Sequence, residues 1–130
     1  MQKILLIHLD PAWRDRLSFI LQHSGFQVVT SHGGHEALAE VSRSHPDGIV
    51  IAEGSHRLNR DELCPRIREL SQSPILILGQ AEEEADGIGF LEMGADAYLT
   101  SPLNLRELLA RVHSLLHRIQ VNTTRLEEDS

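Results

Sequence analysis

The chain lacks the features typical of disulfide-stabilised secreted proteins and of membrane proteins. It has one cysteine, Cys64, which has no second thiol for an internal disulfide and is expected to be a small packing residue. The apolar run that follows Met1 is too short for a signal peptide or a membrane-spanning helix. These absences predict a soluble, cytoplasmic protein.

Positive charge is also scarce. Lysine and arginine together number 12 against 19 aspartate and glutamate residues, which gives a formal net charge of −7 at pH 7. This balance argues against direct binding of nucleic acid or of an anionic membrane. A length of 130 residues suits one domain with a full core. We expect a folded domain over residues 1–119 and a polar C-terminal tail or linker over residues 120–130.

Short apolar or β-branched segments alternate along the chain with patterns of helical period. The expected strands are residues 3–8, 26–30, 48–52, 74–78 and 97–100. The helical patterns follow them, with the last helix running over residues 105–119. This alternation predicts an α/β fold, a (βα)5 doubly wound parallel five-stranded sheet of flavodoxin-like order 2-1-3-4-5.

Two of the helical segments contain residues that disfavour a helix. Residues 53–60 are polar and are expected to be irregular, so that Pro65 falls near the first turn of the helix that follows. The helix expected over residues 82–93 contains Gly87 and Gly89, each costing roughly 1 kcal/mol relative to alanine. We therefore expect that helix to be short or mobile.

In a sheet of this order the functional crevice lies at the carboxyl ends of the first and third strands. Residues 8–10 and 52–54 would line it, flanked by the ends of the fourth and fifth strands. The residue that closes the third strand is Ala52, and its methyl group can do no chemistry.

Two stretches near the C-terminus carry a specific resemblance. Residues 94–103 read GADAYLTSPL and residues 106–112 read RELLARV, which is similar to the GADDYxTKPF and RELLARV signature of response regulator receiver domains. The likeness is strongest to the OmpR/PhoB winged-helix branch of this CheY-like superfamily. Pro46-Asp47 and Pro74-Ile75 match the family's entries to its third and fourth strands. The resemblance covers residues 3–118 and implies a role in two-component phosphorelay signalling.

The resemblance also implies a phosphorylation pocket, in which an aspartate accepts a phosphoryl group from a histidine kinase. An acidic pair holds Mg²⁺, and a hydroxyl and a lysine contact the phosphoryl oxygens. In this chain the acidic pair falls on His8 and Leu9, the acceptor on Ala52, the hydroxyl on Gly79 and the lysine on Ser101. We therefore predict a non-enzymatic pseudo-receiver, without metal or cofactor, that acts through phosphorylation-independent protein contacts, with control of transcription through an output domain as one form.

Other readings of the crevice stay open. Asp10 is either a third acidic residue near the metal position or a helix cap, and Glu53 adjoins the acceptor position but should point to the opposite face. A receiver that uses Asp10 or Glu53 as its acceptor is one alternative. A flavodoxin-like small-ligand or metal-binding domain is another, with His8 beside these carboxylates, or His113 and His117 one helical turn apart, as candidate ligands.

The resemblance further implies a signalling face formed by the fourth helix, the fifth strand and the fifth helix. Tyr98 matches the family's aromatic switch residue, and Glu107 and Arg111 match charged residues through which members of this branch form dimers. Gly87 and Ala97 stand where their usual charged partners would be. The expected partners are a signalling protein or a fused output domain, with a homodimer through this face as a further possibility.

Overall fold

The computed structural model describes residues 1–7, 11–32, 34–52, 57–79, 94–100 and 104–129. Nine elements lie in these ranges. They are β1 (Lys3–Ile7), α1 (Pro11–His23), β2 (Gln27–Ser31), α2 (Gly34–Ser44), β3 (Gly48–Ala52), α3 (Arg57–Leu70), β4 (Ile75–Gly79), β5 (Ala97–Thr100) and α5 (Leu105–Asp129). The expected helix over residues 82–93, with Gly87 and Gly89, lies outside the described residues.

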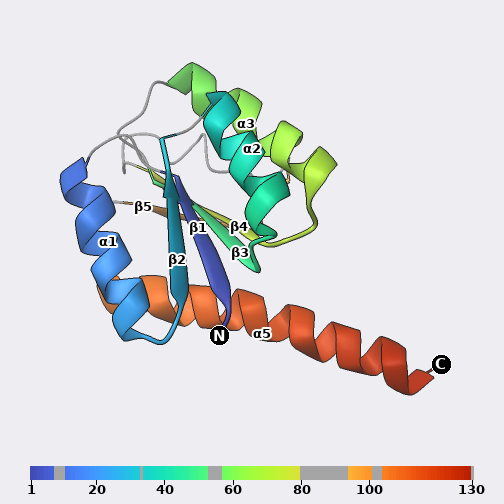
Figure 1. Cartoon of the computed structure of the whole chain (residues 1–130). Coiled ribbons are helices and arrows are strands. Elements are labelled where there is room, and N and C mark those ends of the chain that lie inside the picture. The colour runs from blue at the N-terminus through green and yellow to red at the C-terminus, as the bar shows by residue number, and fades with distance from the viewer. Residues whose placement is uncertain (8–10, 33, 53–56, 80–93, 101–103, 130) are drawn as a thin grey trace.

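The five strands form one parallel sheet in the order β2-β1-β3-β4-β5. Helices α1 and α5 cover one face of this sheet, and α2 and α3 cover the other (Figure 1). Every residue of β3 and β4 is buried, as expected for central parallel strands covered on both faces. The predicted doubly wound, flavodoxin-like fold is therefore confirmed.

Two apolar cores lie on opposite faces of the sheet, and they divide each strand by alternate residues. Along β3, Val50 and Ala52 belong to the core shared with α1 and α5, whereas Ile49 and Ile51 belong to the core shared with α2 and α3. The same alternation separates Leu78 from Ile77 on β4. Side chains along a strand point to opposite faces in turn. Ala52 belongs to the core shared with α1 and α5, whereas Tyr98 of β5 packs against the core shared with α2 and α3.

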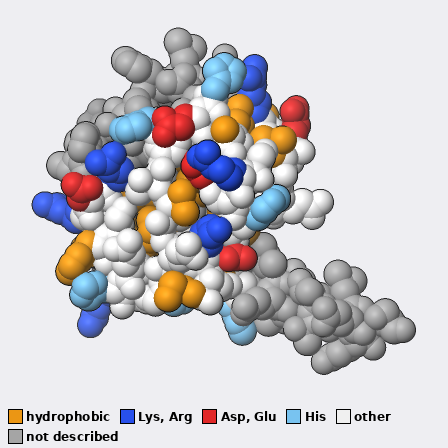
Figure 2. All heavy atoms as spheres, in the orientation of Figure 1, with side chains coloured by type: hydrophobic (Ala, Val, Ile, Leu, Met, Phe, Trp, Pro, Cys, Tyr) orange, Lys and Arg blue, Asp and Glu red, His pale blue; other side chains and the backbone are white. Residues whose placement is uncertain are grey.

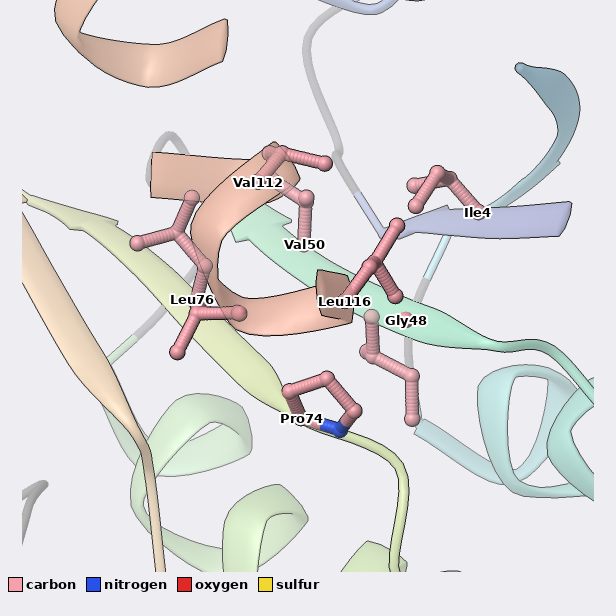
Figure 3. Close-up of a pocket in the computed structure, with 9 residues that line it drawn as sticks. Ile4, Gly48, Val50, Pro74, Leu76, Val112 and Leu116 are labelled. Atoms are coloured by element: carbon pink, nitrogen blue, oxygen red, sulfur yellow. The ribbon is translucent and has the colours of Figure 1, made fainter. Parts of the chain in front are cut away.

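Helix α5 crosses the sheet close to the start of β3, where the strand begins with Gly48 (Figure 3). A Cβ atom on Gly48 would lie 3.1 Å from Ile4 Cδ1 and 3.2 Å from Leu116 Cδ2. The absent side chain thus lets the helix approach the strand closely. A small apolar cavity of about 10 Å³, lined in part by Pro74 and Val112, remains beside this contact.

The start of α3 corrects one prediction. Residues 53–60 were expected to be irregular, but α3 begins at Arg57, and Pro65 is its ninth residue, well past the first turn. The prediction followed the apolar periodicity, which becomes regular at Leu63, whereas the start of the helix is mostly polar. Pro65 therefore removes one internal hydrogen bond from α3.

Smaller differences occur at other element ends. Strand β4 starts at Ile75 and not at Pro74, because proline has no N–H to donate to the ladder; the Pro74 carbonyl still accepts from Ile49 N at 2.9 Å. Strand β2 is shifted by one residue, to Gln27–Ser31. Helix α5 continues to Asp129, beyond the sheet and across the expected boundary at residue 119 (Figure 1).

The face shown in Figure 2 carries acidic and basic side chains interspersed among histidines. No basic patch gathers among the coloured residues of that face, in keeping with the net charge of −7. Among the described residues, none of the helices combines the length and apolar character that a membrane-spanning segment requires.

Candidate functional site

The carboxyl edge of the sheet is where the crevice was predicted, and the described ends of its central strands are apolar. Strand β1 ends at Ile7 beside Ile51, and Ala52 closes β3 beside Leu78 of β4. Ala52 is 3% exposed and packs in the core shared with α1 and α5. The position that the resemblance assigns to the acceptor therefore carries a buried methyl group with no nucleophilic atom.

Gly79 and Tyr98 meet at the same edge, on the face covered by α2 and α3. Tyr98 pairs with Ile77 across β4 and β5, and Gly79 lies two residues further along the same face of β4. A Cβ atom on Gly79 would overlap Tyr98 Oη and would lie 2.6 Å from Cζ and 3.0 Å from Cε2. The tyrosine ring thus occupies the space that a side chain at position 79 would need.

His8, Leu9, Asp10, Glu53 and Ser101 all lie outside the described residues. In the part of the chain that the structure describes, no group of three or more histidine, cysteine, aspartate or glutamate side chains is arranged to hold a metal ion. Among the predicted residues of the crevice, the structure brings Gly79 close to Tyr98 of the predicted signalling face.

Helix α5 and strand β5 supply the described parts of the predicted signalling face. Asn104 caps the helix, since its Oδ1 accepts from Arg106 N at 2.9 Å and from Glu107 N at 3.2 Å. Glu107 and Arg111 are exposed, and they lie one helical turn apart. Tyr98 is half-buried on the neighbouring edge strand, β5.

The two histidines of α5 are exposed, and His113 packs against an aromatic residue. Its ring centroid lies 5.0 Å from that of Phe26, which is 5% exposed in the core shared with α1 and α5. His117 is exposed one turn further along. The contact gives His113 a packing role at the edge of this core.

A polar cluster that the sequence analysis did not identify lies at the opposite, amino edge of the sheet. The Arg68 guanidinium donates to Gly94 O at 2.7 Å, Ser73 O at 2.9 Å, Ser71 O at 3.2 Å and Asp96 Oδ2 at 3.1 Å. Asp96 Oδ2 also accepts from Ile75 N at 2.8 Å. We call Arg68 and Asp96, with these backbone partners, the Arg68 clamp; the Asp96 within the GADAYLT stretch was its one visible signal in the sequence.

The Arg68 clamp holds the backbone carbonyls of Ser71, Ser73 and Gly94 in place. Few polar side-chain groups in the hollow beside it are free to bind a ligand. This hollow lies between the C-terminal ends of α2 and α3 and includes Leu70 and His45. The Ser73 hydroxyl there donates to Pro46 O at 2.6 Å, and the Ser71 hydroxyl accepts from Ser73 N at 3.1 Å. Because both hydroxyls hold the loop together, we assign this region a structural role.

Cys64 lies within α3, one turn before Arg68, and is completely buried. Burial raises the pKa of the Cys64 thiol from 9.0 to about 11, with the nearby Arg68 guanidinium opposing and Asp96 adding to this rise. The thiol is therefore protonated at neutral pH and serves in packing, as the sequence predicted.

The chain is similar to known proteins over most of its length. The model of the response regulator receiver domain matches residues 4–113. The alkaline phosphatase synthesis transcriptional regulatory protein PhoP of Bacillus subtilis is 36% identical over 92% of this chain and 50% of its own length. The response regulator MprA of Mycobacterium ulcerans is 36% identical over 98% of this chain and 53% of its own length.

The chain thus spans about half the length of these curated relatives, which are regulators of the OmpR/PhoB type. Among solved structures, the receiver domain of the TMAO respiratory system response regulator TorR aligns with a TM-score of 0.82 and 32% identity, covering 92% of this chain and 99% of that one. The fold, the match over residues 4–113 and these relatives lead to one conclusion: the chain belongs to the response regulator receiver domain family of two-component systems.

Proposed function

We propose that this receiver domain is a pseudo-receiver, a domain that keeps the receiver fold and regulates a partner through protein contacts without aspartyl phosphorylation. It would act as a non-enzymatic module that needs neither Mg²⁺ nor another cofactor. Receiver domains interact with histidine kinases and output domains, and PhoP of Bacillus subtilis is a transcriptional regulatory protein. We extend this to control of transcription through an output domain that the chain's polar C-terminal segment would lead into.

The observation that carries the proposal is the chemistry of the described strand ends. Phosphoryl transfer to a carboxylate requires a nucleophile, a cation site and groups that stabilise the developing charge. Ala52 offers a buried methyl group where the resemblance places the nucleophile, and Gly79 has no hydroxyl. Tyr98 also fills the space in which a hydroxyl side chain at position 79 would stand.

The sequence adds three further losses at positions outside the described residues. His8 and Leu9 stand where the family has its acidic pair, and Ser101 stands where it has its lysine. A single replacement leaves most of a reaction's groups in place, whereas these replacements remove each of them. A partner is therefore expected to bind the surface, and the exposed Glu107 and Arg111 of α5 suit a dimer or a signalling partner.

The test is a ¹H–¹⁵N NMR titration of the chain with Mg²⁺ and then with beryllofluoride, a stable analogue of an aspartyl phosphate. We expect the amide resonances of Ala52, Gly79 and Tyr98 to stay unchanged at concentrations that saturate a family member retaining the strand-three aspartate. That family member is the positive control. Saturable shifts of these three resonances together would overturn the proposal.

The same titration separates the alternatives. If the resonances shift, Asp10→Asn and Glu53→Gln variants identify which carboxylate has become the acceptor, because the response disappears in the variant that loses it. Shifts that occur with a divalent transition metal alone and disappear in a His8→Ala variant would indicate a metal-binding crevice instead.

A further inference from the structure

We propose that Gly79 and Tyr98 form a fixed pair, in which the tyrosine ring permanently fills the side-chain space of position 79 and holds β5 in one surface state. This inference deepens the proposed function and rests on it, because it assigns Tyr98 a state that no phosphoryl group controls. It concerns regulation: packing within the chain sets the state of Tyr98 in the predicted signalling face.

The strand register explains why the two residues meet. Tyr98 lies opposite Ile77, and Gly79 is the next residue on the same face of β4. A diagonal neighbour on an adjacent strand is within reach of an aromatic side chain. Since the ring atoms Cζ and Cε2 would lie 2.6 Å and 3.0 Å from a Cβ at position 79, any residue other than glycine there must displace the ring.

Packing opposes any outward rotation of the ring. Tyr98 is half-buried and packs against the core shared with α2 and α3, which includes Ile77 and Ile51. Moving the ring outward would expose its apolar body and leave an unfilled space above Gly79. Both effects favour the inward position at all times.

Gly48 provides an internal comparison, because it is another buried strand glycine with a close neighbour. Its side-chain space is approached by Ile4 and Leu116 at 3.1 and 3.2 Å, distances that small adjustments can relieve. At Gly79 the overlap is far deeper, and it involves a rigid ring. A methyl group should therefore move a neighbour at position 79 and cause only local crowding at position 48.

Because Tyr98 lies on the edge strand β5, fixing its ring also fixes part of the surface of that strand. Strand β5 is the edge strand beside β4, and Tyr98 reaches from it to Gly79 at the carboxyl edge. With the ring fixed, the Tyr98 side chain presents the same surface on β5 irrespective of events in the crevice. A protein that contacts this edge would meet a constant surface.

The experiment uses the fact that Tyr98 is the chain's one tyrosine. In the full chain carrying ¹³C-labelled tyrosine, we expect one set of ring resonances, with nuclear Overhauser contacts from the Hε protons to the Gly79 Hα protons. Two sets of ring signals, or one set without these contacts, would overturn the inference. This measurement needs no variant and so does not depend on a variant's folding.

A chemical readout with matched variants provides a second arm. Gly79→Ala should raise the rate at which tetranitromethane nitrates Tyr98 severalfold, because the ring is displaced toward solvent, whereas Gly48→Ala should leave that rate unchanged. Equal nitration rates in Gly79→Ala and the parent chain would contradict the pair. Beryllofluoride distinguishes the two proposals: shifts at Ala52 with intact Tyr98–Gly79 contacts refute the pseudo-receiver and leave the pair standing.

Discussion

The amino and carboxyl edges of the sheet are held together by different kinds of contact. At the amino edge, Arg68 and Asp96 make charge-assisted hydrogen bonds to backbone atoms that connect α3, β4 and β5. At the carboxyl edge, the described strand ends carry Ala52 and Gly79, and an aromatic ring fills the space above the glycine. Polar side chains thus hold the amino edge together, whereas β3 and β4 end in residues without a polar side chain at the edge where chemistry was expected.

This difference shows that the contacts that hold the fold together lie apart from the predicted crevice. The contacts that join the loops at the amino edge do not involve the crevice. Lys3 N donates to Asp47 Oδ2 at 2.7 Å, and Asp47 N donates to Lys3 O at 2.8 Å, which connects β1 to the start of β3. Substitutions at the carboxyl edge therefore leave these contacts intact. Substitutions at the two edges should change the free energy of unfolding by different amounts.

The largest effect is expected from Arg68→Ala. It removes the donor of four hydrogen bonds and leaves the Asp96 carboxylate without its cation, so the free energy of unfolding should fall by about 2–3 kcal/mol. Urea denaturation followed by circular dichroism measures this change. Arg66→Ala is the matched control, because Arg66 is exposed on the same helix. Similar losses for both variants would show that the Arg68 clamp contributes nothing specific.

Gly79→Ala should have the next largest effect. Forcing a methyl group into the space of the Tyr98 ring should lower the free energy of unfolding by about 1–3 kcal/mol, as is typical of overpacking. In a Tyr98→Leu background the same substitution should cost clearly less, because the ring is gone. A double-mutant cycle from urea denaturation measures this coupling. Additive effects would mean that the two residues do not compete for one space.

The pH dependence of stability tests whether the Cys64 thiol is shielded from water next to the Arg68 clamp. Its pKa is raised in the folded state from 9.0 to about 11, so the unfolded chain loses this proton first as the pH rises. The stabilisation that the protonated Cys64 thiol gives the folded state is fully present below pH 9 and is lost between pH 9 and 11. At pH 10 the free energy of unfolding should have fallen by roughly 1 kcal/mol from its value below pH 9. The measurement is the pH dependence of urea denaturation in the parent chain minus that in Cys64→Ala, and a flat difference would refute it.

The smallest effect is expected from His45→Gly, at the amino edge. His45 follows α2 with a φ of 49°, a left-handed conformation in which a side chain is strained, and its N–H donates to Val41 O at 3.2 Å. Glycine adopts this conformation without strain, and the free energy of unfolding should rise by about 0.5–1 kcal/mol. His45→Ala, which keeps the strain, is the control. Equal melting temperatures of the glycine and alanine variants in thermal denaturation would contradict this explanation.

The sequence by itself determined the fold, because its signals are local. The five strands appear as apolar or β-branched segments, and the periodicity of helix residues such as Leu108 and Val112 fixes which side faces the sheet. Strand β3 and strand β5 have the predicted bounds. The start of α3 was missed because its polar first turns show no apolar period before Leu63.

For the candidate site, the sequence identified which groups are absent, since a missing carboxylate or hydroxyl is visible in the residue type. It marked Ala52 and Gly79 individually. The tertiary structure decided that Gly79 and Tyr98 share one space while Ala52 packs on the other face of the sheet. It also decided that Arg68 reaches Gly94 and Asp96, which are 26 and 28 residues away along the chain. Such contacts depend on strand register and side-chain direction, which no local pattern encodes.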